Sequence, residues 1–110
     1  MLDRPLTLPC GAVVTNRMCK AAMTEGLAHS DGTASEELER LYGIWSDGGS
    51  GILLSGNIQV DGDHLERPGN VIIDSKLSDD AFAALQRMAA AGTRNGNHLW
   101  AQISHAGRQT

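Results

Sequence analysis

The sequence predicts an α/β fold with a parallel β-sheet. Two segments, one after Ser35 and one after Ser78, carry apolar residues at helical spacing. Each is followed by a short apolar run of strand length, at 51–55 and at 99–103, and the first run is continuous, as in strands covered on both faces. Strands that alternate with helices form right-handed βαβ units, and these units build a parallel sheet.

The N-terminal segment predicts a small hairpin followed by a buried strand. Apolar residues at 6–8 and 12–14 flank a turn at 9–11 that contains proline and glycine. Asn16 and Arg17 interrupt this pattern, and a second short apolar run follows at 18–23. We expect residues 18–23 to form a strand of the sheet, although Lys20 lies inside the run.

The first helix is predicted to begin after Ser35 and to end at Gly48 and Gly49. A serine in this place can accept hydrogen bonds from the first unpaired amides, and the glutamates that follow favour the positive end of the helix dipole. A glycine pair is typical of a helix end. Four side chains fall on one stripe and are expected to face the core, namely Leu38, Leu41, Tyr42 and Trp45.

A long connection at 58–77 separates the second strand of the sheet from the second helix. It contains an apolar piece at 71–73, and a connection this long is usually functional, because typical ones have about four to six residues. The second helix is capped by Ser78, and the strand at 99–103 follows it. The buried stripe of this helix is predicted from Phe82, Leu85, Met88 and Gly92.

The composition indicates one globular domain and argues against several classes of partner. The chain has 110 residues, of which 41% are hydrophobic and 20% charged. Thirteen acidic residues against nine basic ones give a net charge of −4, which does not favour a nucleic-acid partner. No apolar run approaches the length of a membrane span, about 20 residues. Cys10 and Cys19 lack the spacing of a redox or zinc motif, so we expect a cytoplasmic protein without a metal site.

Three other features could carry chemistry. The glycine-rich run at 48–51 precedes a strand instead of following one, so it predicts a helix end and not a dinucleotide loop. His105 and Arg108 follow the last strand and could either hold an anion or bond loop carbonyls. Glu66 and Arg67 form either a solvated pair or a latch for the long connection.

The polar residues of most interest follow the predicted strands at their carboxyl ends. Thr24, Gly56, Asn57 and Gln102 all take this position, which is the ligand face of a (β/α) barrel or an open α/β sheet. Gln102 lies in a strand that we expect to be buried, and a buried amide without a partner costs a few kcal/mol. Considered alone, Gln102 is better explained by bonding to neighbouring backbone than by bonding to a ligand.

Three stretches together carry a resemblance to a known family. They are Asn-Arg-Met-Cys-Lys-Ala-Ala-Met-Thr at 16–24, Gly-Gly-Ser-Gly-Ile-Leu-Leu-Ser-Gly-Asn at 48–57 and Gln-Ile-Ser-His-Ala-Gly-Arg at 102–108. In this order and spacing they resemble the N-terminal part of the Old Yellow Enzyme family. These are NAD(P)H:flavin oxidoreductases, or ene-reductases, on an FMN-binding (β/α)8 TIM barrel. The resemblance implies that residues 1–110 are part of such a barrel domain, a hairpin plus about three βα units.

The resemblance implies cofactor-binding roles for five residues. Ala22, Met23 and Thr24 match the end of the first barrel strand, where the family contacts the flavin near N5 and O4 and where Thr24 could tune the flavin. Gly56 matches a small residue whose amide approaches the isoalloxazine ring. Gln102 matches a glutamine that bonds the pyrimidine edge, which now favours the ligand alternative for this residue. Donors aimed at that edge stabilise the reduced flavin.

The expected activity is hydride transfer from NADH or NADPH through FMN to the alkene of a small activated substrate. Some family members carry a tyrosine where this chain has Gly26, so no proton donor is expected there. A barrel needs about 250 residues, so we expect no complete catalytic set and no activity from this chain alone. The alternative is a non-catalytic α/β fragment that self-associates or joins a partner chain to complete a barrel.

Overall fold

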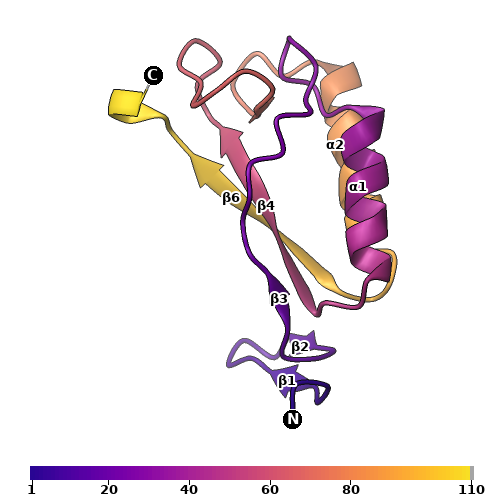
Figure 1. Cartoon of the computed structure of the whole chain (residues 1–110). Coiled ribbons are helices and arrows are strands. Elements are labelled where there is room, and N and C mark those ends of the chain that lie inside the picture. Colours follow the sequence, from indigo (N-terminus) through magenta and orange to yellow (C-terminus); the bar gives the residue numbers. More distant parts are fainter. Residues whose placement is uncertain (110) are drawn as a thin grey trace.

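The structure of the chain is a computed structural model that describes residues 1–109. It begins with the predicted hairpin, formed by β1 (Leu6–Thr7) and β2 (Val13–Val14), in which Leu6 pairs with Val14. The Leu8 amide donates to the Ala12 carbonyl at 2.8 Å and closes the turn. The hairpin lies at the amino ends of the sheet strands, next to the N-terminus (Figure 1).

A parallel sheet of four strands is organised around β4 (Ile52–Gln59). The strand β6 (His98–Ser104) pairs along the length of β4. On the opposite edge, β3 (Cys19–Lys20) pairs with the start of β4, and β5 (Val71–Ile72) pairs with its end. The predicted α/β class and parallel sheet are confirmed, and β5 adds a short strand inside the long connection.

Two helices, α1 (Glu36–Asp47) and α2 (Asp79–Gly92), lie side by side and run in the same direction on one face of the sheet (Figure 1). Both predicted caps are present: Ser35 Oγ accepts from the Leu38 amide at 3.2 Å, and Ser78 Oγ accepts from the Ala81 amide at 3.1 Å. The core between helices and sheet consists of Ala34, Leu38, Tyr42, Leu53, Ile58, Val71, Ala84 and Met88.

The strands differ from the prediction in length. Only Cys19–Lys20 of the expected strand 18–23 forms ladder pairs, because the segment that follows turns to pack its backbone against Gly56. The strand β4 extends beyond the predicted 51–55 to Gln59, and its pairing with β6 is irregular between Leu54 and Asn57. There β4 advances three residues while β6 advances two, so β4 contains one extra residue.

The burial of three predicted core residues is also different. Phe82 is 54% exposed, because α2 packs through Ala81, Ala84 and Met88 and its small alanines allow close approach. Gln102 is exposed and not buried, and its neighbour Ile103 is 57% exposed. Within residues 1–109, β6 pairs with β4 alone, which leaves its other edge uncovered.

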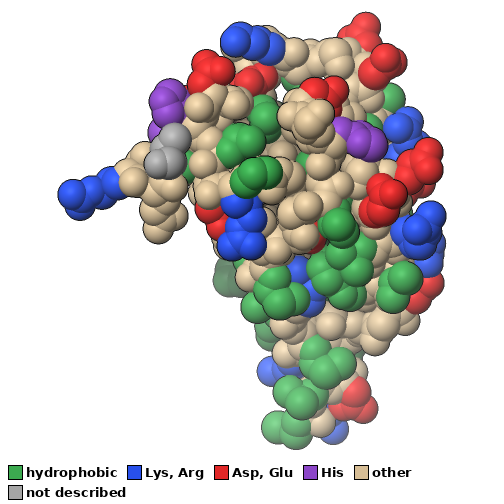
Figure 2. Space-filling view, turned by 45° about the horizontal axis from the view of Figure 1, so that its top comes forward, with side chains coloured by type: hydrophobic (Ala, Val, Ile, Leu, Met, Phe, Trp, Pro, Cys, Tyr) green, Lys and Arg blue, Asp and Glu red, His purple; other side chains and the backbone are tan. Residues whose placement is uncertain are grey.

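Exposed apolar side chains also gather around the hairpin. Figure 2 shows them as a hydrophobic area at the end of the molecule that carries the N-terminus. The exposed large apolar residues of this N-terminal segment are Met1, Leu2, Leu6, Val13 and Met18. This end of the molecule therefore differs from the carboxyl end of the strands, where polar side chains collect.

Candidate functional site

Gln102 and Asn57 are direct neighbours across β6 and β4. The Gln102 Nε2 atom donates to Asn57 Oδ1 at 2.5 Å, and the Gln102 backbone amide donates to Ser55 Oγ at 3.0 Å. The side-chain amide of Gln102 is thus paired with a second amide side chain and not with backbone. The interpretation that it bonds neighbouring backbone is therefore wrong, and its exposure leaves it accessible to a ligand.

Glu66 brings the long connection back over the carboxyl ends of the strands. Its Oε2 atom accepts from Asn57 Nδ2 at 2.6 Å and from Thr24 Oγ1 at 3.2 Å. The Arg67 guanidinium lies 3.6 Å from Glu66 Oε1, and the Glu66 side chain is 19% exposed. Of the two interpretations of Glu66, the latch is confirmed. We call Thr24, Glu66, Asn57 and Gln102 the carboxyl-edge network.

The charge of Glu66 is stabilised by this network. The hydrogen bond from Asn57, followed by the bond from Thr24 and the charge of Arg67, holds the pKa of the Glu66 carboxyl below its usual value, although partial burial opposes the shift. The carboxylate is therefore ionised at neutral pH and acts only as an acceptor. Thr24 and Gln102, both predicted from the sequence, are connected through Glu66 and Asn57.

Gly56 lies at the point where the backbone of residues 23–25 packs against β4. A Cβ atom at Gly56 would lie 2.5 Å from the Met23 carbonyl oxygen and 2.8 Å from the Thr24 Cα, and it would also meet the Glu25 carboxylate. The Gly56 amide donates to the Tyr42 hydroxyl at 3.2 Å. The space left by the missing side chain is thus occupied by the segment 23–25, and the role expected of Gly56 toward a cofactor stays a prediction.

The other two expected cofactor residues lie in this same segment. Ala22 is half-buried, whereas the Met23 side chain is 54% exposed. Both follow β3 without joining its ladder, and Met23 contacts Gly56 through its backbone. The segment is therefore held against the middle of β4 by its main chain.

A polar cluster that the sequence analysis did not predict lies beside Gly56 and contains Tyr42 and Glu25. The Tyr42 hydroxyl donates to Glu25 Oε2 in a short hydrogen bond. Burial, together with the bond to Glu25, raises the pKa of Tyr42, so the phenol stays protonated and keeps donating. Tyr42 lies on the predicted buried stripe, and a buried tyrosine needs a partner for its hydroxyl, which is the signal that could have revealed this cluster.

Lys20 belongs to the same cluster. Its Nζ atom lies 4.1 Å from the centroid of the Trp45 ring, and within residues 1–109 it has no hydrogen-bond partner. Burial lowers the pKa of the Lys20 ammonium, while the charge of Glu25 opposes this shift. Lys20 therefore points toward α1 and stabilises its contact with the sheet.

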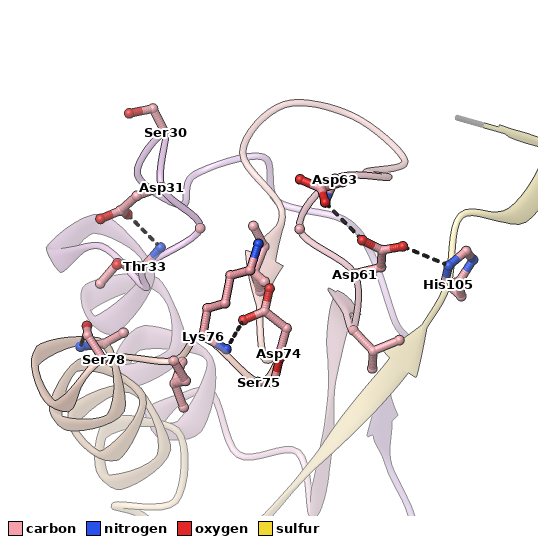
Figure 3. Close-up of a pocket in the computed structure, with 16 residues that line it drawn as sticks. Ser30, Asp31, Thr33, Asp61, Asp63, Asp74, Ser75, Lys76, Ser78 and His105 are labelled. Atoms are coloured by element: carbon pink, nitrogen blue, oxygen red, sulfur yellow. Dashed lines mark hydrogen bonds and ion pairs between the residues drawn. The ribbon is translucent and has the colours of Figure 1, made fainter.

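An open groove of about 770 Å³ lies between the segment 30–33 before α1 and the loops that follow β4, β5 and β6 (Figure 3). Asp61 Oδ2 accepts from His64 Nδ1 at 2.8 Å and lies 3.4 Å from His105 Nε2. His105 is thus paired with a carboxylate, and its Nδ1 atom accepts from the Gly107 amide at 2.9 Å, while the anion site with Arg108 stays a prediction. The charged residues that line the groove are Asp31, Asp61, Asp63, Asp74, Lys76 and His105.

This groove repels anions at neutral pH. The backbone amide of Asp63, followed by the His64 side chain, lowers the pKa of Asp61, and the backbone amide of Thr33 lowers the pKa of Asp31. Both carboxyls are therefore ionised. The chemistry of this groove does not fit a phosphate group.

No cluster of histidine, cysteine and acidic side chains within residues 1–109 could hold a metal ion. Neither α1 nor α2 is long and apolar enough to cross a membrane, and the same holds for every helix in the described part of the chain.

The sequence is similar to curated flavin enzymes over nearly its whole length, although no family model matches it. It is 38% identical over 108 residues to an NADH-dependent flavin oxidoreductase of Neonectria sp., covering 97% of this chain and 14% of that protein. It is 35% identical over 106 residues to an NADH-dependent flavin oxidoreductase of Hypocrea jecorina, covering 96% of this chain and 26% of that protein. The chain thus spans at most about a quarter of the length of these relatives.

The fold is similar to that of solved barrel enzymes. The old yellow enzyme from Trypanosoma cruzi superposes with a TM-score of 0.80 at 23% identity, over 98% of this chain and 28% of that chain. The predicted partial barrel, a hairpin followed by about three βα units, is confirmed by this match.

Proposed function

We propose, from the premise that this chain resembles the N-terminal part of the Old Yellow Enzyme family, that it supplies the flavin-ring edge of an NAD(P)H-dependent oxidoreductase. Residues 1–110 would form the first portion of an FMN-binding barrel domain. The substrate would be a small molecule with an activated alkene. The proposal is supported by relatives that are NADH-dependent flavin oxidoreductases and that match nearly the whole chain.

The observation that carries the proposal is the carboxyl-edge network. Thr24 follows β3, Gln102 lies in β6, and the two are connected at the carboxyl edge of the sheet through Glu66 and Asn57. This edge is where open and closed α/β sheets bind ligands. Asn57 takes one hydrogen of the Gln102 amide, so the amide retains one hydrogen and its Oε1 atom for a further partner.

The residues of this edge fit the ring of FMN, and the groove described above does not fit its phosphate. Gln102 is exposed and offers both a donor and an acceptor to a ring edge, and Thr24 offers its oxygen lone pairs. Gly56 would act indirectly by holding Thr24 in place. When bound, FMN would supply the chemistry of hydride transfer between NAD(P)H and the alkene.

A second candidate function is association with another chain that completes the sheet. The edge of β6 favours it, because Trp100 is 44% exposed and Ile103 is 57% exposed there. An exposed strand edge with apolar side chains is a template for pairing. In this case the fragment need not bind flavin by itself.

Titration of FMN with the purified chain tests the first candidate. Added FMN should bind weakly and saturably, measured by quenching of flavin fluorescence. Gln102→Ala should weaken binding by about fivefold, since a hydrogen bond contributes about 1 kcal/mol. Gln86→Ala, which removes an exposed glutamine from α2, is the matched control and should leave the affinity unchanged. Equal affinities for both variants would overturn the assignment of the ring edge.

A further inference from the structure

The carboxyl-edge network fixes the direction of each of its hydrogen bonds. An ionised carboxylate can only accept, so Glu66 requires the Thr24 hydroxyl and the Asn57 Nδ2 atom to donate. Once Nδ2 faces Glu66, Asn57 presents its Oδ1 to Gln102. The Gln102 amide must then donate through Nε2. The negative charge of Glu66 thus determines which group donates and which accepts in each hydrogen bond of the network.

We infer that Glu66, acting through Asn57, is a positioning residue that holds the Gln102 amide in one orientation for a ligand with a lactam edge. In this orientation Gln102 keeps its Oε1 atom and its second Nε2 hydrogen for the ligand. A lactam, which carries a carbonyl next to an N–H, is the complementary partner. The identity of the ligand rests on the proposed function, because the isoalloxazine ring of a flavin carries this group. The role of Glu66 toward Gln102 does not rest on it.

The charge of Glu66 is what makes the orientation unique. A neutral side chain at this position could accept from Asn57 Nδ2 or donate to Asn57 Oδ1, so both amides could rotate by half a turn and still form hydrogen bonds. Gln102 would then have two orientations, in which its Oε1 and Nε2 atoms exchange places toward the ligand. The groups that face the Glu66 carboxylate are Thr24, Asn57, Asn70 and the guanidinium of Arg67, and none of them is acidic.

Nuclear magnetic resonance of the ¹⁵N-labelled chain without ligand tests the positioning role. As the pH is lowered from neutral through the pKa of Glu66, the side-chain amide signals of Asn57 and Gln102 should shift together with the Glu66 carboxyl signal. Glu66→Gln should abolish this common transition. Glu37→Gln, which removes one charge from an exposed position of α1, is the matched control and should preserve it. A Gln102 amide that ignores the titration of Glu66 in the parent chain would overturn the inference, even if the Glu66 variant failed to fold.

The lactam preference is tested by comparing FMN with its N3-methylated form, which lacks the ring N–H. The parent chain and Glu37→Gln should prefer FMN by about fivefold, the worth of one hydrogen bond, and Glu66→Gln should lose this preference. Equal affinity of the parent chain for both forms would overturn the lactam preference. Absence of FMN binding in every form would contradict the proposed function, while the ligand-free titration would still decide the role of Glu66.

Discussion

Gly56 and Met23 are so close that a Cβ atom on Gly56 would lie 2.5 Å from the Met23 carbonyl oxygen. This distance is too short for any side chain, and the obstacle is main chain that cannot rotate away. The contact ties β4 to the segment that carries Thr24. The sequence resemblance pointed to this glycine, and the group that approaches it in the structure is protein.

Gly56→Ala should therefore destabilise the fold itself. Overpacking of this kind costs about 1–3 kcal/mol, and we expect the free energy of unfolding in urea to fall by such an amount. Gly62→Ala is the matched control, because the nearest atom to its new Cβ is the mobile carboxylate tip of Asp74 at 3.0 Å. If both variants unfold at the same urea concentration, Gly56 is not a packing position.

Tyr42→Phe should lower stability and also change its dependence on pH. It removes the hydroxyl that donates to Glu25 and accepts from the Gly56 amide and leaves these two groups only their direct contact of 3.4 Å, at a cost of about 1–3 kcal/mol. Because the folded chain raises the pKa of Tyr42, its contribution is complete below the unfolded pKa of about 10 and declines as the pH rises above it. Urea unfolding across the alkaline range should show this decline in the parent chain, and the Tyr42→Phe variant should show less of it. A parallel decline in both proteins would contradict the assignment.

Glu66 should stabilise the long connection only when it is ionised. Its pKa is lowered in the folded chain, so its contribution is present above the unfolded value of about 4.3 and is lost as the pH falls through the folded pKa. In Glu66→Gln, the free energy of unfolding should depend less on pH in this acidic window. Limited proteolysis within 60–70 should likewise increase at acid pH in the parent chain. Cleavage independent of both pH and the substitution would argue against the latch.

Self-association should occur through the outer edge of β6. Ile103→Lys places a charge on that strand and should shift sedimentation toward the monomer. Phe82→Lys, at an equally exposed apolar position on α2, is the control and should leave the distribution unchanged. A parent chain that sediments as a monomer at every concentration would remove the support for the second candidate function.

The chain alone should not purify with stoichiometric FMN and should not reduce cyclohexenone with NADPH. Thr24 and Gln102 address only the ring of the cofactor, whereas the groove beside His105 is acidic and does not favour a phosphate. Each charge-assisted hydrogen bond that is missing at the phosphate weakens binding by about 1.5–3 kcal/mol. Absorbance at flavin wavelengths and NADPH oxidation measure the two outcomes, and one FMN per chain with turnover would contradict the prediction.

The features that could be predicted from the sequence are those set by nearby residues. Ser35 and Ser78 cap their helices as expected because a cap needs only the next turn of chain. The exposure of Phe82 and Gln102 could not be predicted, since it depends on which elements pack beside them. Glu66 reaches Thr24 across forty-two positions, and only the folded path of the connection brings them together.

The extra residue of β4 between Leu54 and Asn57 reverses the alternation by which successive side chains point to opposite faces of the sheet. Leu53 and Ile58 are an odd number of positions apart, so strict alternation would place them on opposite faces, yet both belong to the core beneath the helices. Asn57 consequently faces away from the helices. Removal of one residue here would exchange the two faces of the strand end, turning the amide into the apolar interior and the isoleucine toward solvent. A single inserted residue thus lets Leu53 and Ile58 both pack under the helices while Asn57 stays in the carboxyl-edge network.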